Sequence, residues 1–392
     1  MIKSQIITIT EIDDVDLALE ELNVQISGLE LLRNTAGIAA VYSDFVDTGV
    51  YEAVAKALPF PLAGTTAQRQ AANEWTNNFL FSILVLTSDD CEFSAGASDV
   101  LPETGDVKDL TQKCYSDLRS KLGGDIKLTF LFYPFISSHF PYKFTKAISE
   151  IDEKVPVFGS AAGYPYEGRP SENRSLCGNY AYNDRLSMLL VSGNVSPKFY
   201  ISPLTKESAI MPDVGVITAA RDNYALEINN INAESFLEKV IPNLGEFKTS
   251  RFLATFCIFE EKDKKGEVLS STVRTLWRCE DGAAKFSGLI QPGTVLSIAD
   301  WTVNSVITTT KKIVEQIRAE HNGGTVLLYS YLPRLFSLHG NQKEELELLR
   351  EAFTGNFNYL AAYGDALMCP SSVTETVSNN NQQENSIIAC VL

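Results

Sequence analysis

The sequence has few basic residues, no long hydrophobic run and no recognisable targeting segment. Lys and Arg number 33 against 49 Asp and Glu, which gives a formal net charge of −16. A surface of that sign repels phosphate backbones, so nucleic acids and anionic membranes are poor candidate partners. No stretch reaches the roughly 18 apolar residues that a membrane span needs, and the N-terminus lacks the apolar core of a signal peptide. We therefore expect a cytoplasmic protein with no membrane insertion.

Paired cysteines are also missing. The chain has seven cysteines, scattered along its length, and no two of them stand in a C-x-x-C spacing. An odd, unpatterned set predicts neither a disulfide framework nor a zinc site. We expect reduced and mostly buried thiols, as in other cytosolic proteins.

The sequence contains none of the common catalytic motifs. H-E-x-x-H, the P-loop, G-x-S-x-G and the dinucleotide signature G-x-G-x-x-G are all absent. The histidines are only His139, His321 and His339, and each is expected to be structural or at the surface. We therefore expect no catalytic residues and no enzyme. An enzyme acting on a small carboxylate stays an alternative, with Arg334 as anchor and Asp365 or His339 as acid and base.

What the chain does contain is an internal repeat. Residues 123–163 and 323–366 each begin with a Gly-Gly pair, continue as a strand, a helix and a second strand, and end at a glycine-marked turn. His139 and His339 each stand fifteen residues after the second of these glycines. A fainter copy without histidine covers residues 37–66. Because duplication sets architecture, we expect one strand–helix–strand unit reused across two domains.

The remaining pattern predicts an α/β fold, with mixed β-sheets layered with helices. Short apolar runs such as 37–43 are typical of strands that are covered on both faces, and 79–98 reads as an antiparallel hairpin. A chain of 392 residues is long enough for two domains. Prolines and a lapse in periodicity at 203–212 place the boundary, giving domains 1–205 and 206–392. The Ser/Asn/Gln-rich stretch 371–384 is expected to be disordered.

Three glycine turns at strand ends are the candidate ligand site. In α/β folds ligands lie where strands end and loops converge, and small residues let a ligand approach the backbone. The alternative is that each glycine only serves a tight turn or close packing. The candidate turns are Gly64-Thr65-Thr66, Gly159-Ser160-Ala161 and Gly364-Asp365.

Ser330, Tyr331 and Arg334 follow the first strand of the C-terminal copy and extend this site. The guanidinium of Arg334 would clamp a carboxylate through two hydrogen bonds, and the alternative is a surface ion pair. Arg169 and Arg174, in a long Gly/Pro/Tyr-rich loop at 163–178, offer the same chemistry more weakly.

A haem is the one cofactor considered. His139 stands among Phe135, Phe140 and Tyr142, an apolar and aromatic setting in which an axial haem ligand would sit. Aromatic clusters are more often core, so no cofactor and no metal is the first expectation. His139 or His339 would be the ligand under the haem alternative.

Several short motifs resemble those of the FIST sensory proteins. PLAGTT at 61–66 and PVFGSAAGY at 156–164 are similar to the FIST-N module, and the likeness to FIST-C lies in LLYSYLPRLFSLHGNQKEELELLREAF at 327–353, YLAAYGDA at 359–366 and Asn385-Ser386. The resemblance implies a FIST-N-like domain at 1–205 and a FIST-C-like domain at 206–392. The family often has Ser-Cys-x-x-Arg where this chain has Ser330-Tyr331 and a displaced Arg334. It often has Gly-Glu where this chain has Gly364-Asp365.

The resemblance implies a sensory role in signal transduction. It implies binding of a small ligand such as an amino acid or a derivative, with the signal passed to a separate partner protein. A haem-based nitric oxide sensor is the alternative that some relatives suggest. The residues expected to contact the ligand are Gly64, Thr65, Thr66, Gly159, Ser160, Ser330, Tyr331, Arg334, Gly364 and Asp365.

Overall fold

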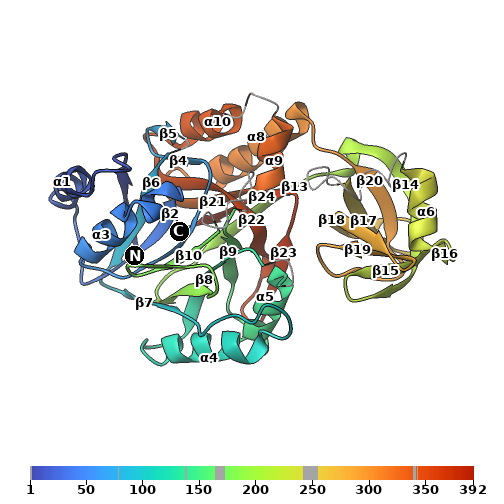
Figure 1. Cartoon of the computed structure of the whole chain (residues 1–392), viewed down its shortest axis with the longest axis horizontal. Helices are drawn as coiled ribbons and strands as arrows, with labels where there is room; N and C mark the ends of the chain where they lie inside the picture. The colour runs from blue at the N-terminus through green and yellow to red at the C-terminus, as the bar shows by residue number, and fades with distance from the viewer. Residues whose placement is uncertain are drawn as a thin grey trace. The chain divides into compact units, whose positions relative to one another are not determined.

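The structure is a computed structural model that describes residues 2–77, 79–136, 139–163, 173–241, 255–338, 341 and 343–392 (Figure 1). The chain folds into two compact units. Unit 1 comprises residues 1–202, 310–382 and 387–392, and unit 2 comprises residues 203–309 and 383–386. Unit 2 begins at Pro203, inside the proline-containing stretch that predicts a boundary. That residues 206–392 form a FIST-C module stays a prediction.

Unit 1 contains two sheets. The first has six strands in the order β1 (Lys3–Ile9), β6 (Phe81–Ser88), β2 (Asn34–Val41), β3 (Leu62–Thr66), β10 (Ser175–Cys177) and β11 (Tyr180–Tyr182). The main path of the second is β13 (Lys198–Pro203), β24 (Ser386–Val391), β21 (Gly324–Tyr331), β22 (Phe357–Val373), β9 (Val157–Ala161), β8 (Ile126–Tyr133), β12 (Ser187–Gly193) and β7 (Cys91–Ala97). The hairpin β4 (Gln70–Ala72) and β5 (Trp75–Asn77) joins β22, as does β23 (Ser378–Gln383).

Alternating side chains of these strands build a layered core in unit 1. In β8, Phe130 and Phe132 pack with residues of β2 and β6, so the two sheets lie face to face. Leu131 and Tyr133, pointing to the other face of β8, pack with helices α4 (Lys108–Arg119) and α5 (Pro141–Ser149). Both faces are therefore buried, which explains why the strand sequences are continuously apolar.

Helices cover the outer faces of both sheets. The first sheet carries α1 (Val15–Ile26) and α3 (Val50–Ala57), and the β21/β22 part of the second carries α8 (Val303–Glu320), α9 (Leu332–Ser337) and α10 (Glu344–Phe353). The expected α/β class with mixed sheets layered with helices is thus confirmed.

The three copies of the repeat form three parallel strand pairs. These are β2 with β3, β8 with β9, and β21 with β22, each joined by a crossover that contains helix. Parallel neighbouring strands need such a crossover, so the strand–helix–strand pattern in the sequence predicts that the two strands of each copy pair in parallel. All three pairs lie in unit 1, whereas the expectation from the sequence is that they spread over two domains.

Unit 2 is built from antiparallel strands. Strand β14 (Ala209–Arg221) pairs with both β20 (Val295–Ala299) and β15 (Tyr224–Ile228), so the sheet closes on itself through β17 (Thr255–Lys262), β18 (Val268–Glu280) and β19 (Ala283–Phe286). The short helix α6 (Ala233–Val240) contributes Phe236 and Leu237 to the core of this six-stranded barrel.

Residues 371–384 are ordered, and the expected disorder is wrong. β22 runs on to Val373 and β23 follows at Ser378–Gln383. The side chain of Asn380 accepts a hydrogen bond from Val157 N at 2.8 Å and donates one to Val155 O at 2.8 Å. These bonds tie the polar segment to the parallel pair of the second copy, because an amide can replace a backbone partner at a strand end.

The expectation of unpaired and mostly buried thiols is met. All seven cysteines are free; six are buried and Cys177 is half-buried. Burial raises the pKa of Cys177 to about 11 and that of Cys114 to about 12, so both thiols stay protonated at neutral pH. Within the described part of the chain, no helix is long and apolar enough to cross a membrane.

Candidate functional site at the strand ends

The strand ends of the three copies meet in unit 1. Gly163 N donates to Thr66 O at 3.4 Å, which joins the ends of the first and second copies. Tyr363 O lies 3.8 Å from the position that a Cβ on Gly163 would take, which brings in the third copy. Strand β22 also pairs with β9, with Asp365 opposite Ala161. We call this region the strand-end site.

The glycines of the site stand within strands, and the prediction of glycine turns is wrong. Gly64 lies in β3, Gly159 in β9 and Gly364 in β22. A Cβ on Gly64 would lie 2.0 Å from Ala39 O, and one on Gly159 would lie 1.9 Å from Leu131 O. Ala39 and Leu131 are their register partners on the preceding parallel strand. The glycines are therefore required by close backbone approach, the alternative left open by the sequence.

Gly364 is required by a side chain and not by a neighbouring backbone. A Cβ there would lie 2.7 Å from both Cβ and Oγ of Ser160, across the β9–β22 pair. The absence of a side chain at Gly364 thus leaves room for Ser160. Ser160 Oγ is buried and has no hydrogen-bond partner among the described residues.

The threonine hydroxyls of the first copy are used inside the protein. Arg174 N donates to Thr66 Oγ1 at 2.9 Å, and the hydroxyls of Thr65 and Thr66 lie 3.4 Å and 3.2 Å from Arg174 O. Both threonines are buried. They join β3 to the start of β10, which accounts for hydroxyl-bearing residues at this strand end.

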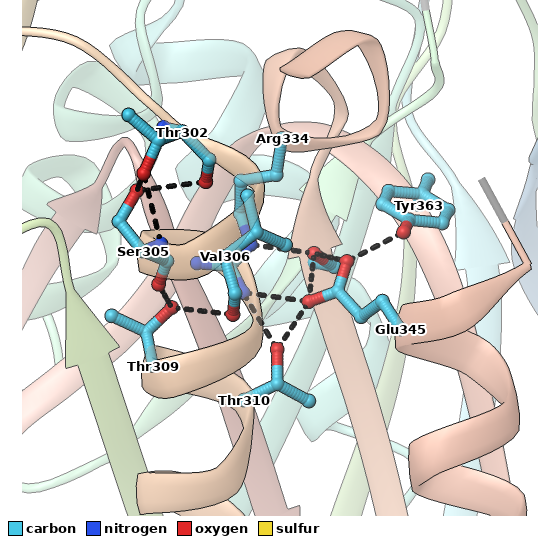
Figure 2. Close-up of polar contacts among 9 residues, drawn as sticks. Thr302, Ser305, Val306, Thr309, Thr310, Arg334, Glu345 and Tyr363 are labelled. Carbon is cyan, nitrogen blue, oxygen red and sulfur yellow. Dashed lines mark hydrogen bonds and ion pairs between the residues drawn. The ribbon is translucent and has the colours of Figure 1, made fainter. Parts of the chain in front are cut away.

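Arg334 belongs to a buried polar network with Glu345 and Tyr363 (Figure 2). Ser330 is part of the same network. Arg334 Nη2 lies 2.6 Å from Glu345 Oε1, and both side chains have an exposed fraction of 0%. Arg334 Nε donates to Ser330 Oγ at 2.9 Å, and Nη2 donates to Thr310 Oγ1 at 2.8 Å. The guanidinium does bind a carboxylate, as its chemistry predicts, but that carboxylate is Glu345 of the same chain.

Glu345 is the acceptor on which the network converges. Its carboxylate also accepts from Thr310 Oγ1 at 2.6 Å, from Ser330 Oγ at 3.0 Å and from the Tyr363 hydroxyl. Burial, together with the Glu345 charge and hydrogen bond, raises the pKa of Tyr363 well above its usual value. The network thus joins one residue each from α8, β21, α9, α10 and β22, with Tyr363 always a donor.

Three half-buried polar residues border the packed part of the strand-end site. They are Gln68, Arg69 and Asp365. Burial lowers the pKa of Arg69, and the nearby Tyr363 hydroxyl acts in the opposite direction. Arg69 O accepts from Tyr363 N at 3.2 Å, and Asp365 lies two residues further along the same strand. Gln68 and Arg69 are absent from the predicted set; the only local signal for them is their position directly after the PLAGTT motif.

His139 is held inside the core of unit 1. Its ring is buried in unit 1, where Nε2 lies at hydrogen-bond distance from Pro102 O and the ring packs edge-on against Phe144. One ring nitrogen is therefore engaged with the backbone, and a haem at His139 stays a prediction. His321 Nε2 lies 2.8 Å from the Tyr200 hydroxyl. His339 lies outside the described residues, which hold no cluster of three metal-ligating side chains.

The weaker candidates and the clefts lie elsewhere. Arg174 Nη2 forms a surface ion pair with Asp47 Oδ1 at 2.8 Å, and Arg169 is outside the described residues. Two clefts, of about 760 and 970 Å³, are lined by residues of unit 1, and neither lining includes a predicted site residue. Which of the ten predicted residues contact a ligand stays a prediction.

Comparison with known proteins gives one assignment. No curated protein matches the chain. The family model of the FIST N domain matches residues 36–231, half of the chain. This match covers the first two repeat copies and thus two of the three strand ends that meet at the site. The chain therefore belongs to the FIST family, whose domain is a sensory domain of signal transduction.

Proposed function

We propose that unit 1 is the input part of a signalling system and binds a small amino acid or amino acid derivative at the strand-end site. A separate protein would receive the signal. The observation that carries the proposal is the convergence of three strand ends, from three copies of one unit, next to half-buried polar residues. Ligands of α/β proteins bind where strand ends and loops meet.

The charges at the border of the site favour a zwitterion. Arg69 and Asp365 carry opposite charges and stand on neighbouring segments, since Arg69 O bonds to Tyr363 N two residues before Asp365. A guanidinium recognises a carboxylate, and a carboxylate recognises an ammonium group. Ser160, with a buried hydroxyl that lacks a partner among the described residues, would be satisfied by a polar ligand atom or a water.

In this proposal Ser330 and Arg334 have a positioning role. Their polar atoms bind Glu345 and Thr310, so they fix the ends of β21 and β22 without touching the ligand. Tyr331, Gly64, Gly159 and Gly364 shape the packed floor of the site. The departures from the usual family pattern at Tyr331 and Asp365 then change the chemistry of the site, since aspartate keeps the negative charge with a shorter side chain.

A thermal-shift screen tests the proposal. The wild type is heated with single amino acids, small dicarboxylates and hemin, beside Arg69→Ala and Asp365→Asn, with Arg278→Ala as a matched arginine control at a surface ion pair of unit 2. Ligand at a hundred times its Kd stabilises by about 2.7 kcal/mol, a rise of several degrees. We expect one amino acid class to raise Tm in the wild type and in Arg278→Ala, and a much smaller rise in the other two variants.

Two results would contradict the proposal. The first is the absence of a shift with every amino acid and carboxylate in the panel. The second is a shift of undiminished size in both Arg69→Ala and Asp365→Asn. A shift produced by hemin alone, with a Soret band on titration, would instead support the haem alternative.

A further inference from the structure

The smaller of these two clefts, of about 760 Å³, lies at the opposite end of β21 and β22 from the strand-end site. It is bordered by β1, by the β4–β5 hairpin, by the first residues of β21 and β22, and by the C-terminal Leu392. Its size falls in the range of small-molecule sites. The nine uncharged polar or acidic side chains in its lining are Ser4, Thr8, Gln25, Asn73, Glu74, Thr325, Thr354, Asn356 and Asn358.

Trp75 gives this cleft an exposed aromatic face. The side chain has an exposed fraction of 51%, and it makes no hydrogen bond, ring contact or cation–π contact with the described residues. An indole left so open and unpartnered is unusual, because Trp normally buries its large apolar surface. A ligand with an apolar face would bury it.

The hairpin holds Trp75 in a fixed position. On one side, Thr354 Oγ1 and the Tyr359 hydroxyl donate to Asn73 O at 2.9 and 2.7 Å. On the other side, Thr76 Oγ1 donates to Glu347 Oε1 of α10 at 2.6 Å. Because both neighbours of the Glu74–Trp75 pair are anchored, the aromatic wall is preorganised, which lowers the entropic cost of binding.

The opposite wall is equally fixed, and several polar groups remain available. Asn358 Nδ2 donates to Ser4 O at 2.8 Å, and the hydroxyls of Thr325 and Ser4 are 2.6 Å apart. By contrast, the side chains of Glu74 and Asn356 make no hydrogen bond or ion pair with the described residues. A carboxylate and an amide together can accept and donate to neighbouring hydroxyl groups of one ligand.

The charge of the cleft disfavours anionic ligands and offers little attraction to cationic ones. Lys3 Nζ is paired with Glu30 Oε1 at 2.7 Å, so among the lining residues Glu74 is the charged group without an ion pair to the described part of the chain. A chain with a net charge of −16 further disfavours phosphates and carboxylates here. Cation-binding cages use several aromatic rings, whereas Trp75 is the exposed aromatic residue of this lining.

We propose that this cleft binds a neutral polyhydroxylated ligand, a mono- or disaccharide, stacked on Trp75 and hydrogen-bonded by Glu74 and Asn356. A sugar ring combines an apolar C–H face with hydroxyl groups around its edge, which matches an indole face flanked by an amide and a carboxylate. This site goes beyond the proposed function, because it is separate from the strand-end site and takes a different ligand class.

Titration of the full chain with sugars tests the inference. Glucose, galactose, mannose, maltose and cellobiose are added, with glucuronate and glucosamine as charged counterparts, and binding is followed by calorimetry and tryptophan emission. Trp75 is the tryptophan of unit 1, while Trp277 and Trp301 lie in unit 2. Trp277→Phe is therefore the matched control.

We expect at least one neutral sugar to bind and to shift the emission in the wild type and in Trp277→Phe. Trp75→Ala should weaken binding by about tenfold or more, Trp75→Phe should restore part of it, and Asn356→Ala should weaken it by up to about tenfold. Circular dichroism and Tm should be unchanged in these surface variants. Arg69→Ala should bind the sugar normally, which separates this site from the strand-end site.

Three results would overturn the inference. One is no binding of any neutral sugar in calorimetry. Another is sugar binding of wild-type affinity in both Trp75→Ala and Asn356→Ala. The third is binding of glucosamine or another amine in preference to all neutral sugars, which would assign the cleft to cations instead.

Discussion

The two ends of the parallel pair β21/β22 differ in how their polar groups are satisfied. At the carboxyl end, Arg334, Glu345 and Tyr363 are fully buried and bind one another (Figure 2). At the amino end, Glu74 and Asn356 line an open cleft and have no partner among the described residues. Arg334, which has the chemistry to bind a carboxylate, is thus occupied by Glu345 at one end, whereas Glu74 and Asn356 have side chains that are available at the other.

The difference teaches that the type of a residue does not by itself indicate a binding site. An arginine after a strand is a good carboxylate ligand, but a buried guanidinium needs a charge partner and finds it in Glu345. An asparagine at a turn carries little sequence signal, yet Asn356 stands exposed beside an exposed tryptophan. The state of each polar group, satisfied or open, therefore decides which residues at either end are free to contact a ligand.

The largest expected effect comes from disrupting the buried network at the carboxyl end of β21/β22, which we call the closed end. The amino end, with its cleft, is the open end. Glu345→Ala would leave the Arg334 guanidinium buried without a counter-charge, and Thr310, Ser330 and Tyr363 without their acceptor. Removing one partner of a buried pair typically costs about 3–5 kcal/mol. We therefore expect a large fall in the urea midpoint of unit 1, whereas Asn356→Ala at the open end should change its stability by less than about 0.5 kcal/mol.

A double replacement sharpens this test. In Arg334→Met/Glu345→Leu both charges leave together, so no unpaired charge is buried and much of the lost stability should return. If Glu345→Ala unfolds no more easily than Asn356→Ala, the network does not hold the carboxyl end. If the double variant binds the ligand of the strand-end site normally, Arg334 does not contact that ligand.

Part of this closed end is predictable from the sequence. The repeat predicts the three parallel pairs because strand–helix–strand order is a local pattern, and it places Ser330 and Arg334 at the end of β21. It does not identify Glu345 as the partner. That pairing depends on how α10 packs over β22, and a glutamate within an acidic helix start looks like any solvent-facing residue.

The glycines show a second limit of what the sequence predicts. Gly64 and Gly159 stand out because they recur at one place in the repeat, but the sequence assigns them to turns, where glycine is most frequent. Their cause is the carbonyl oxygen of the neighbouring parallel strand, which only the register of the sheet reveals. The cleft has no sequence signature at all, since it joins residues 2–8, 25, 73–75, 324–325, 354–358 and 392, which no local pattern connects.

Two glycine replacements are expected to change the stability of unit 1 by an intermediate amount. Gly64→Ala at the strand-end site would place a Cβ 2.0 Å from Ala39 O, with no unusual backbone angle involved. Gly355→Ala at the rim of the cleft meets no atom within 4 Å, but Gly355 has a φ of +88°. We expect about 3 kcal/mol or more for Gly64→Ala and about 1 kcal/mol for Gly355→Ala, measured by urea denaturation.

The comparison of these two glycines separates contact from backbone strain. Gly28→Ala is the control, since its Cβ would meet only Gln25 O at an ordinary 3.5 Å. Equal losses of stability for Gly64→Ala and Gly355→Ala would mean that the backbone at the strand-end site shifts to make room for a Cβ as easily as a surface turn does. The packed floor assigned to that site would then be incorrect.

The smallest expected effect concerns the wall of the open cleft. The hydrogen bond from Thr76, and after it the bond and charge of Arg350, hold the pKa of Glu347 below its usual value. A depressed carboxyl pKa contributes stability that is complete above the unfolded pKa, near 4.5, and is lost as the pH falls through the folded pKa. Thr76→Val removes the largest cause of the lowered Glu347 pKa. The replacement should therefore reduce the free energy of unfolding more at pH 7 than at about pH 3.5.

The size of this effect is limited because Glu347 has a side-chain exposure of 37%, which screens its interactions. We expect a loss of less than about 1 kcal/mol at pH 7, measured by urea denaturation at both pH values. Thr48→Val is the matched control, because its hydroxyl donates to the backbone oxygens of Ile12 and Asp44, and its cost should not depend on this titration. A Thr76→Val cost that is the same at both pH values, with unaltered Trp75 emission, would mean that Glu347 does not anchor the cleft wall. The open end would then lack the fixed geometry that distinguishes a binding site from a surface hollow.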